Sequence, residues 1–295
     1  MKSWRLTGSA QHPELVETDV PQPKPREGEV LVRVHAAGIT PTEVLWSPSW
    51  QTKSGEKRTG AIPSHEFSGE IAETGEEIYG MNDWFAEGAL AEYCVTQPAW
   101  IAPKPRHLSH AEAASVPIGA LTAWQGLFDR AKLQPGERVL IHGGAGGVGI
   151  FAIQLAHSHG AHVITTVSAR NSEFVTALGA NEVIDYKSAS FEDKARDIDV
   201  VFDTVGGDTL RRSWNVLKPN GRLVTIAADA ETPPDERTKQ AFFIVEPNRQ
   251  QLMQMIGNLR PVVDTVLPFS QAADAYSGYV KKQGRGKLVV AVRPA

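Results

Sequence analysis

The stretch that decides the fold reads Val139-Leu140-Ile141-His142-Gly143-Gly144-Ala145-Gly146-Gly147-Val148-Gly149-Ile150. An apolar, strand-forming run ends in glycines at the spacing Gly-x-Gly-x-x-Gly, namely Gly144, Gly146 and Gly149, and an apolar helical segment follows at once. Dinucleotide binding requires this order of strand, tight turn and helix. We expect Gly144 to permit the turn, Gly146 to let backbone approach a pyrophosphate, and Gly149 to let the helix pack against the strand.

The segments around this stretch predict a parallel sheet. The next strand candidate, residues 161–167, lies at the spacing expected for a βαβ unit of ~30 residues. From Glu137 onward strands and helices alternate, which predicts an open, doubly wound parallel sheet with helices on both faces, in other words an α/β fold. We expect residues 242–245 to form the last strand of this sheet.

The N-terminal part of the chain predicts a β-rich domain. Its short strand candidates are separated by turn residues, which is typical of a small β-barrel, and they span residues 30–36, 62–71, 77–81 and 88–95. A final strand candidate, residues 287–292, follows the completed parallel sheet, so we expect it to return to this domain. The expected organisation is a discontinuous domain, residues 1–112 and 247–295, around a dinucleotide-binding domain, residues 113–246.

Composition excludes several classes of protein. The 295 residues are 41% hydrophobic and 22% charged, with a net charge of −4, so no basic field favours nucleic acid or a membrane surface. Neither a membrane-spanning run nor a signal peptide after Met1 is evident, and we expect a cytoplasmic protein. The single cysteine, Cys94, excludes an intramolecular disulfide and a zinc site built from clustered cysteines.

Several segments together resemble the medium-chain dehydrogenase/reductase superfamily, and within it the zinc-free quinone oxidoreductase branch. The matching segments are residues 36–41, 65–69, 116–127, 139–149, 178–186, 203–207 and 286–290. The resemblance implies a GroES-like β-barrel catalytic domain built from both chain ends and a central Rossmann domain. It also implies hydride transfer from NADPH in the cleft between these domains, usually in a homodimer.

Two departures from the superfamily pattern concern the β-rich domain. Zinc-dependent relatives carry a cysteine where this chain has Thr40, and another in the segment where it has residues 117–122. His65 stands where they place a histidine ligand, but His65 and Glu66 without a third ligand do not make a catalytic zinc site, so we expect no metal and interpret His65 as a hydrogen-bonded strand residue. Residues 72–77 are also shorter than the family's usual excursion, which predicts a trimmed barrel.

The end of the second parallel strand indicates the cofactor. NAD-binding units usually place an acid there, ~20 residues after the glycines, to bond the ribose hydroxyls. This chain has Ser168 and Arg170 instead, and a guanidinium and a hydroxyl bind a 2′-phosphate, so we expect NADPH. Tyr186 resembles the family's tyrosine near the same phosphate, and Lys187 is a further candidate.

The resemblance implies the remaining contacts. For the cofactor they are Thr122, Gly144, Gly146, Gly147, Val148, Gly149, Val205, Ala227, Phe243 and Lys287. For the substrate pocket they are Thr40, as a hydrogen-bond donor, and Trp46 and Trp84, as flat apolar walls, although ordinary packing explains the two tryptophans equally well. No residue is assigned as the proton donor.

We expect such a site to reduce a substrate that readily accepts a hydride ion. Without a metal to polarise an unactivated ketone, quinones and α,β-unsaturated carbonyls are the better substrates. Two alternatives stay open: a zinc-type alcohol dehydrogenase, and an NADPH-binding redox sensor with little turnover.

Overall fold

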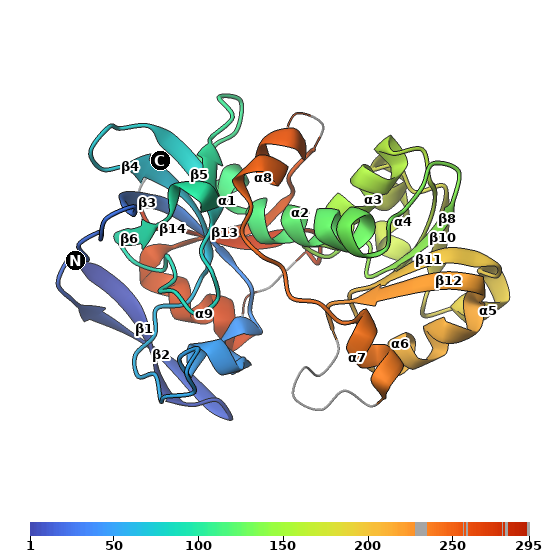
Figure 1. Ribbon diagram of the computed structural model, residues 1–295, viewed down its shortest axis with the longest axis horizontal. Coiled ribbons are helices and arrows are strands. Elements are labelled where there is room, and N and C mark those ends of the chain that lie inside the picture. Colours follow the sequence, from blue (N-terminus) through green and yellow to red (C-terminus); the bar gives the residue numbers. More distant parts are fainter. Residues whose placement is uncertain (228–234, 256, 258, 279, 281–282, 294–295) are drawn as a thin grey trace. The chain divides into compact units, whose positions relative to one another are not determined.

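The computed structural model divides into two compact units, residues 1–118 with 246–295 and residues 119–245 (Figure 1). It describes residues 1–227, 235–255, 257, 259–278, 280 and 283–293. Because the discontinuous unit contains both ends of the chain, the central unit is inserted into it as one continuous segment.

The central unit is built on a five-stranded parallel sheet of order β10-β9-β8-β11-β12. Its strands are β8 (Arg138–His142), β9 (His162–Val167), β10 (Glu182–Asp185), β11 (Ile198–Asp203) and β12 (Leu217–Thr225). Every residue of β11 is buried, as expected for an inner strand of a parallel sheet covered on both faces. The predicted doubly wound sheet is confirmed.

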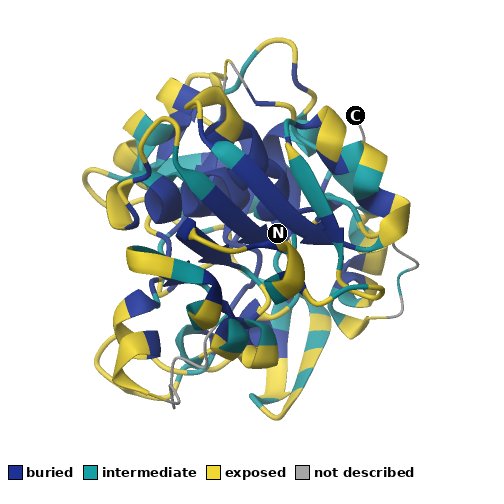
Figure 2. Ribbon diagram, turned by 90° about the vertical axis from the view of Figure 1, so that its right-hand side faces the viewer, coloured by how far each residue is buried: buried dark blue, intermediate teal, exposed yellow. Residues whose placement is uncertain are grey.

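Among the described residues, four α-helices connect these strands, and a fifth, α7, follows the last one. They are α3 (Gly149–Ser158), α4 (Ser172–Ala177), α5 (Phe191–Lys194), α6 (Gly207–Ser213) and α7 (Glu236–Ala241). The first eight residues of α3 are all buried, so this helix packs on the sheet over most of its length. Buried residues are dark blue in Figure 2; in this unit they include all of β11 and most of α3, whereas β12 is exposed at residues 218–220.

The predicted last strand at residues 242–245 is wrong. The structure has only an isolated parallel bridge there, between Thr225 and Phe242, and the sheet ends at β12. Phe243 and Val245 are buried while Ile244 is 53% exposed, an alternation that imitates a strand. The Phe243 ring stacks on Phe202 at 6.5 Å between centroids, so this segment is held by side-chain packing onto the sheet rather than by a ladder.

The discontinuous unit contains a seven-stranded sheet. Six strands follow the order β13-β14-β3-β4-β5-β7, and β6 also pairs with β3. The strands are β3 (Val30–Ile39), β4 (Glu66–Ile71), β5 (Glu77–Met81), β6 (Tyr93–Thr96), β7 (Ile101–Pro103), β13 (Val263–Pro268) and β14 (Lys287–Ala291). The predicted return of the C-terminal strand is confirmed, because β14 pairs antiparallel with β3 from Leu288–Ile39 to Ala291–Ala36.

Several local predictions in this unit need correction. The strand expected at residues 30–36 is longer, since residues 37–39 are buried, continue β3 and pair with β4 and β14. The hairpin of β1 (Lys2–Ser9) and β2 (His12–Asp19) was not expected. The short segment at 72–77 is a tight turn between β4 and β5, in which Gly75 N donates to Ile71 O at 2.8 Å.

The helices of the discontinuous unit are α1 (His110–Ala114), α8 (Arg249–Met255) and α9 (Ala272–Ser277). Ser109 caps α1, with its hydroxyl accepting from Glu112 N and the Glu112 side chain accepting from Ser109 N. Helix α2 (Pro117–Trp124) begins at the end of this unit. None of the helices in the described part of the chain is long and apolar enough to cross a membrane.

Candidate functional site

The glycine loop between β8 and α3 shows why each glycine is needed. Gly143 has a φ of +76°, so the left-handed residue of the turn is Gly143 and not Gly144, which corrects the role expected of Gly144. A Cβ on Gly144 would lie 2.1 Å from Thr165 Oγ1, and one on Gly149 would lie 2.3 Å from Gly143 O. A Cβ on Gly146 would approach only Gly143 O, at 3.3 Å. Gly146 is therefore the exposed position where an incoming group comes close to backbone.

A buried histidine fixes the start of this loop. His142 ends β8, with Nδ1 3.0 Å from Thr166 Oγ1 and Nε2 3.0 Å from Ser213 Oγ. Ser213 donates its own proton to Thr209 O and Thr166 Oγ1 accepts from Gly143 N, so we assign the neutral ring with its proton on Nε2. Burial lowers the pKa of His142 to about 4, which agrees with that assignment.

Parallel strands bring most of the predicted cofactor residues to one edge of the sheet. Ser168, Tyr186, Val205 and Ala227 lie within two residues of the carboxyl ends of β9, β10, β11 and β12, and the glycine loop follows β8 in the same way. Ligands of open parallel sheets bind at this edge. The edge therefore offers a continuous row of positions for an extended molecule.

The groups at the ends of β9 and β10 are basic and polar. Tyr186 N donates to Val167 O at 3.2 Å, which places Tyr186 beside Ser168 across the two strands. Arg170 is exposed, Ser168 is half-buried, and Tyr186 is 59% exposed. Asp185, an acid at the end of β10, accepts from Lys187 N at 3.1 Å, and this N–H lowers the pKa of Asp185. Arg170 and Lys187 outweigh this one carboxylate, so the edge favours an anion.

A buried carboxylate shapes the loop after β11. Asp203 accepts from Val205 N at 3.2 Å, from Gly206 N at 3.0 Å and from Thr225 Oγ1 at 2.8 Å. Burial raises the pKa of Asp203. These bonds leave the side chain of Val205 54% exposed at the edge.

Thr122 and Phe243 do not follow strand ends. Thr122 lies on α2 and is 2% exposed, and the ring of Phe243 packs against Phe202. Neither side chain is presented on the surface as those of Arg170, Tyr186 and Val205 are. A contact from either position to a cofactor would therefore come from a small exposed part of the residue or from its backbone.

In the discontinuous unit, Thr40 is linked to two charged residues. Lys287 Nζ donates to Thr40 Oγ1 at 3.1 Å and also forms an ion pair with Glu66. Glu66 is completely buried, and its second oxygen accepts from Ile118 N at 2.9 Å. Burial raises the pKa of Glu66, and the neighbouring Lys287 opposes that shift. The ion pair thus holds an ammonium group against the Thr40 hydroxyl.

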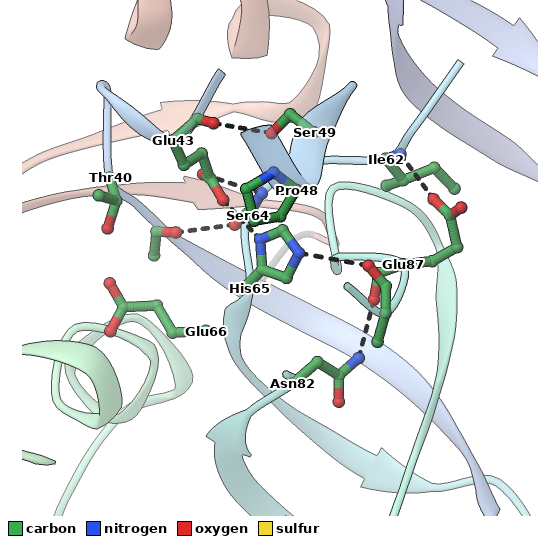
Figure 3. A network of polar contacts seen from close by, with 12 residues as sticks. Thr40, Glu43, Pro48, Ser49, Ile62, Ser64, His65, Glu66, Asn82 and Glu87 are labelled. Atoms are coloured by element: carbon green, nitrogen blue, oxygen red, sulfur yellow. Dashed lines mark hydrogen bonds and ion pairs between the residues drawn. The ribbon is translucent and has the colours of Figure 1, made fainter. Parts of the chain in front are cut away.

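A second buried network surrounds His65 (Figure 3). His65 Nδ1 lies 2.6 Å from Glu43 Oε2, and its Nε2 lies 3.3 Å from Ala86 O. Glu43 Oε1 also accepts from Ser64 N at 3.0 Å and from the Tyr276 hydroxyl at 2.7 Å. Sequence reasoning missed Glu43, although an acid three residues after Thr40, in a chain segment followed by His65, was a usable signal.

The two candidate tryptophans contact each other. The Trp46 and Trp84 ring centroids are 5.0 Å apart in an edge-to-face arrangement, and the Trp84 ring lies 5.1 Å from the His65 ring. Trp46 is 37% exposed, whereas Trp84 is 6% exposed. Trp46 therefore presents an apolar surface to solvent. Its ring packs on Trp84, and the Trp84 ring in turn packs on His65.

The side chains of Thr40, His65 and Glu66 do not fit a catalytic zinc ion. Both ring nitrogens of His65 are occupied by protein acceptors, and both oxygens of Glu66 are occupied by Lys287 and Ile118 N. Thr40 replaces a thiolate, and the Lys287 ammonium beside it would repel a dication. In the part of the chain that the structure describes, no three His, Cys, Asp or Glu side chains are grouped to hold a metal.

Comparison with known proteins identifies relatives of both units. Residues 26–106 match the family model of the alcohol dehydrogenase GroES-like domain, and residues 178–290 match that of zinc-binding dehydrogenase. A chloroplastic NADPH-dependent alkenal/one oxidoreductase of Arabidopsis thaliana is 32% identical over 98% of this chain and 79% of its own length.

Solved structures agree with these matches. A quinone oxidoreductase from Coxiella burnetii superposes with a TM-score of 0.85 at 32% identity, and the match covers 99% of each chain. A quinone oxidoreductase from Thermus thermophilus, solved also in complex with NADPH, gives a TM-score of 0.79 at 30% identity over 99% of this chain and 100% of its own.

His142 makes stability at the glycine loop depend on pH. The unfolded chain binds a proton at the ordinary histidine pKa of 6.5, whereas folded His142 does so only at about 4. The stability contributed by the neutral ring is therefore present above pH 6.5 and is lost as pH falls towards 4, by about 3 kcal/mol in total. We expect His142→Asn to flatten the fall in unfolding free energy between pH 7 and 4.5, measured by urea denaturation.

The control for this measurement is His107→Asn, because His107 is exposed. It should leave the pH dependence as it is in the unmodified chain. Parallel pH curves for the His142→Asn variant and the unmodified chain would show that His142 is not held neutral by the fold.

Proposed function

Because the chain belongs to the medium-chain dehydrogenase/reductase superfamily, in its quinone oxidoreductase and alkenal reductase branch, we propose that it uses NADPH to reduce a quinone or an α,β-unsaturated carbonyl without zinc. The observation that carries this proposal is the row of groups at the carboxyl edge of the parallel sheet, with basic and hydroxyl side chains at its β9 and β10 end. Assembly as a homodimer and a cytoplasmic location stay predictions.

The glycine loop is the seat proposed for the pyrophosphate. Gly146 leaves the backbone open to an approaching phosphate, and the N-terminus of α3 directs N–H groups and the positive end of its dipole towards it. Ser168 and Arg170 would then bind the 2′-phosphate, with Tyr186 beside them. A guanidinium matches a phosphate with two parallel hydrogen bonds. When bound, NADPH supplies the hydride.

Thr40 is the group proposed to bind the substrate carbonyl. Its oxygen already accepts a hydrogen bond from Lys287, so its own proton is directed elsewhere and is more strongly polarised. As hydride arrives at the substrate, negative charge develops on the carbonyl oxygen, and a donor supported by a fixed ammonium stabilises it. A proton from Thr40, replaced by Lys287 and then by solvent, would complete the reduction of the substrate by two electrons and two hydrogens.

This donor set favours activated substrates. A hydroxyl that accepts a hydrogen bond from an ammonium polarises a carbonyl oxygen less than a bound Zn²⁺ ion does. It would therefore increase the rate of reduction of an unactivated ketone only a little. Quinones and enones spread the incoming charge over a conjugated system and need less help. The exposed face of Trp46 provides an apolar surface for such a planar substrate.

Arg170 should determine the preference for the phosphorylated cofactor. Arg170→Ala removes a charge-assisted hydrogen bond to the 2′-phosphate, so KM for NADPH should rise by about tenfold or more, whereas KM for NADH should change by less than about twofold. Steady-state kinetics with a quinone or enone measure both. Arg211→Ala, which removes an exposed arginine paired with Asp208, is the control and should change neither value. Equal increases for both cofactors would count against the assignment.

Thr40 should be required for turnover and not for folding. Thr40→Val keeps the shape of the side chain and removes the donor, so kcat should fall by about tenfold to a thousandfold, as when one donor to a developing oxyanion is lost. Thr40→Ser should restore most of the activity. Thr42→Val, at an exposed position nearby, should behave like the unmodified enzyme. Unchanged kcat in Thr40→Val would remove Thr40 from the mechanism.

A further inference from the structure

The central unit contains a cavity that the proposed reaction does not use. It has a volume of about 410 Å³ and is lined by Arg130, Trp214, Arg222, Arg237, Gln240 and Phe242, with smaller contributions from neighbouring residues. These residues come from β12, from α7, from the 3-10 turn Trp214–Val216 and from the π-helical turn Gln125–Arg130. Strand β12 is an edge strand of the parallel sheet (Figure 1).

Arg222 directs one side of this cavity towards the amino end of the sheet. Its side chain pairs with Glu137, the residue immediately before β8, through bonds of 2.9 and 2.5 Å, and its Nε donates to Ala131 O at 2.8 Å. Glu137 lies at the amino end of β8, whereas the glycine loop follows the carboxyl end of the same strand. Arg222 therefore reaches towards the amino end of β8, whereas Val224 and Phe242, which bridges to Thr225, extend the cavity to the carboxyl end of β12.

Two further arginines are held against aromatic rings. The Arg237 Cζ lies 4.1 Å from the centroid of the Trp214 ring, and the Arg130 Cζ lies 5.7 Å from that of the Phe243 ring. Such a contact occupies the face of the guanidinium and leaves the N–H groups at its edge. It also restricts a long side chain in advance, which lowers the entropy lost when a ligand binds. Both arginines are thus prepared to donate hydrogen bonds.

The cavity carries a net positive charge. Glu137 neutralises Arg222, but no carboxylate is among the residues that line the cavity. Among the described residues, neither Arg130 nor Arg237 forms an ion pair with an acid. Two cationic groups from different walls, α7 and the π-helical turn, therefore remain without a counter-charge from that part of the chain.

From this geometry we propose that the cavity binds a small phosphate ester. Its volume falls at the lower end of the range of small-molecule pockets and is too small for a folded partner. Guanidinium groups that approach from two walls suit a tetrahedral phosphate, which carries about two charges and three acceptor oxygens, better than a planar carboxylate. Gln240 adds an uncharged donor, and the aromatic rings provide an apolar floor for the rest of the ligand.

A second copy of this chain is a less suitable occupant. Two identical faces brought together around a two-fold axis would place the same unneutralised arginines opposite one another. Like charges at an interface are unfavourable. Dimer formation through this face would overturn the proposal, and sedimentation detects it.

The test is calorimetric titration of the protein with inorganic pyrophosphate, in the presence of saturating NADPH so that the glycine loop is occupied. We expect one site per chain and a Kd that rises at least about tenfold in Arg130→Gln/Arg237→Gln, because two charge-assisted donors are lost. Both side chains are exposed, so this variant should stay folded, and the loss of two ring contacts should lower its unfolding temperature only slightly. Added sodium chloride should weaken binding.

Two control variants show where the anion binds. Arg196→Gln/Arg211→Gln removes two exposed charges elsewhere on the same unit and should leave Kd unchanged. Arg170→Ala should also leave it unchanged, and a loss of pyrophosphate binding there would place the anion at the proposed cofactor edge instead. This result does not depend on the proposed enzyme activity, since binding and not turnover is measured.

Three outcomes would overturn the proposal. They are the absence of saturable binding, equal Kd values for the unmodified protein and Arg130→Gln/Arg237→Gln, and a shift of the sedimentation coefficient in that variant. The last outcome would show that the cavity is part of an interface between copies of the chain.

Discussion

The close approach of α3 to the end of β8 is the constraint on which the rest of the central unit depends. A Cβ on Gly149 would lie 2.3 Å from Gly143 O, so only glycine allows the helix to begin this near the strand. The helix then points its N-terminus at the edge where the other parallel strands end. Neutral His142, bonded to Thr166 and Ser213, fixes the strand end from inside the unit. The absence of a side chain at Gly149 thus sets where the N-terminus of α3 lies, and this is where we propose that the pyrophosphate binds.

The discontinuous unit depends on a buried charge pair instead. Glu66 on β4 is fully buried, and Lys287 at the start of β14 is its partner, so the ion pair joins the two separate segments of the unit. A buried carboxylate without its partner is costly, which keeps Lys287 in place. The same ammonium contacts Thr40. A fixed cation therefore stands beside Thr40, and it follows from the packing of the unit rather than from a separate binding event.

Local patterns predicted the central unit well. Strand β8 contains the apolar run Val139–Ile141, and β9 lies within the predicted residues 161–167, because a buried parallel strand has a short and distinct pattern. The hairpin β1–β2 was missed because its alternation is weak, with no buried residue in β2. Contacts between distant segments could not be predicted for another reason. The hydrogen bond from Tyr276 to Glu43 joins residues 233 positions apart, and that from Lys287 to Thr40 joins residues 247 positions apart. Such pairs depend on the final topology, which no local spacing records.

The most direct test of the central claim is the affinity of the protein for NADPH when Gly146 is replaced by alanine. The added Cβ would approach only Gly143 O, at 3.3 Å, so the loop should keep its shape and the protein its melting temperature. The methyl group would nevertheless stand where the pyrophosphate must come close. Fluorescence titration should then give a Kd at least about tenfold higher than that of the unmodified protein. An unchanged Kd in a variant that melts at the same temperature would contradict the account.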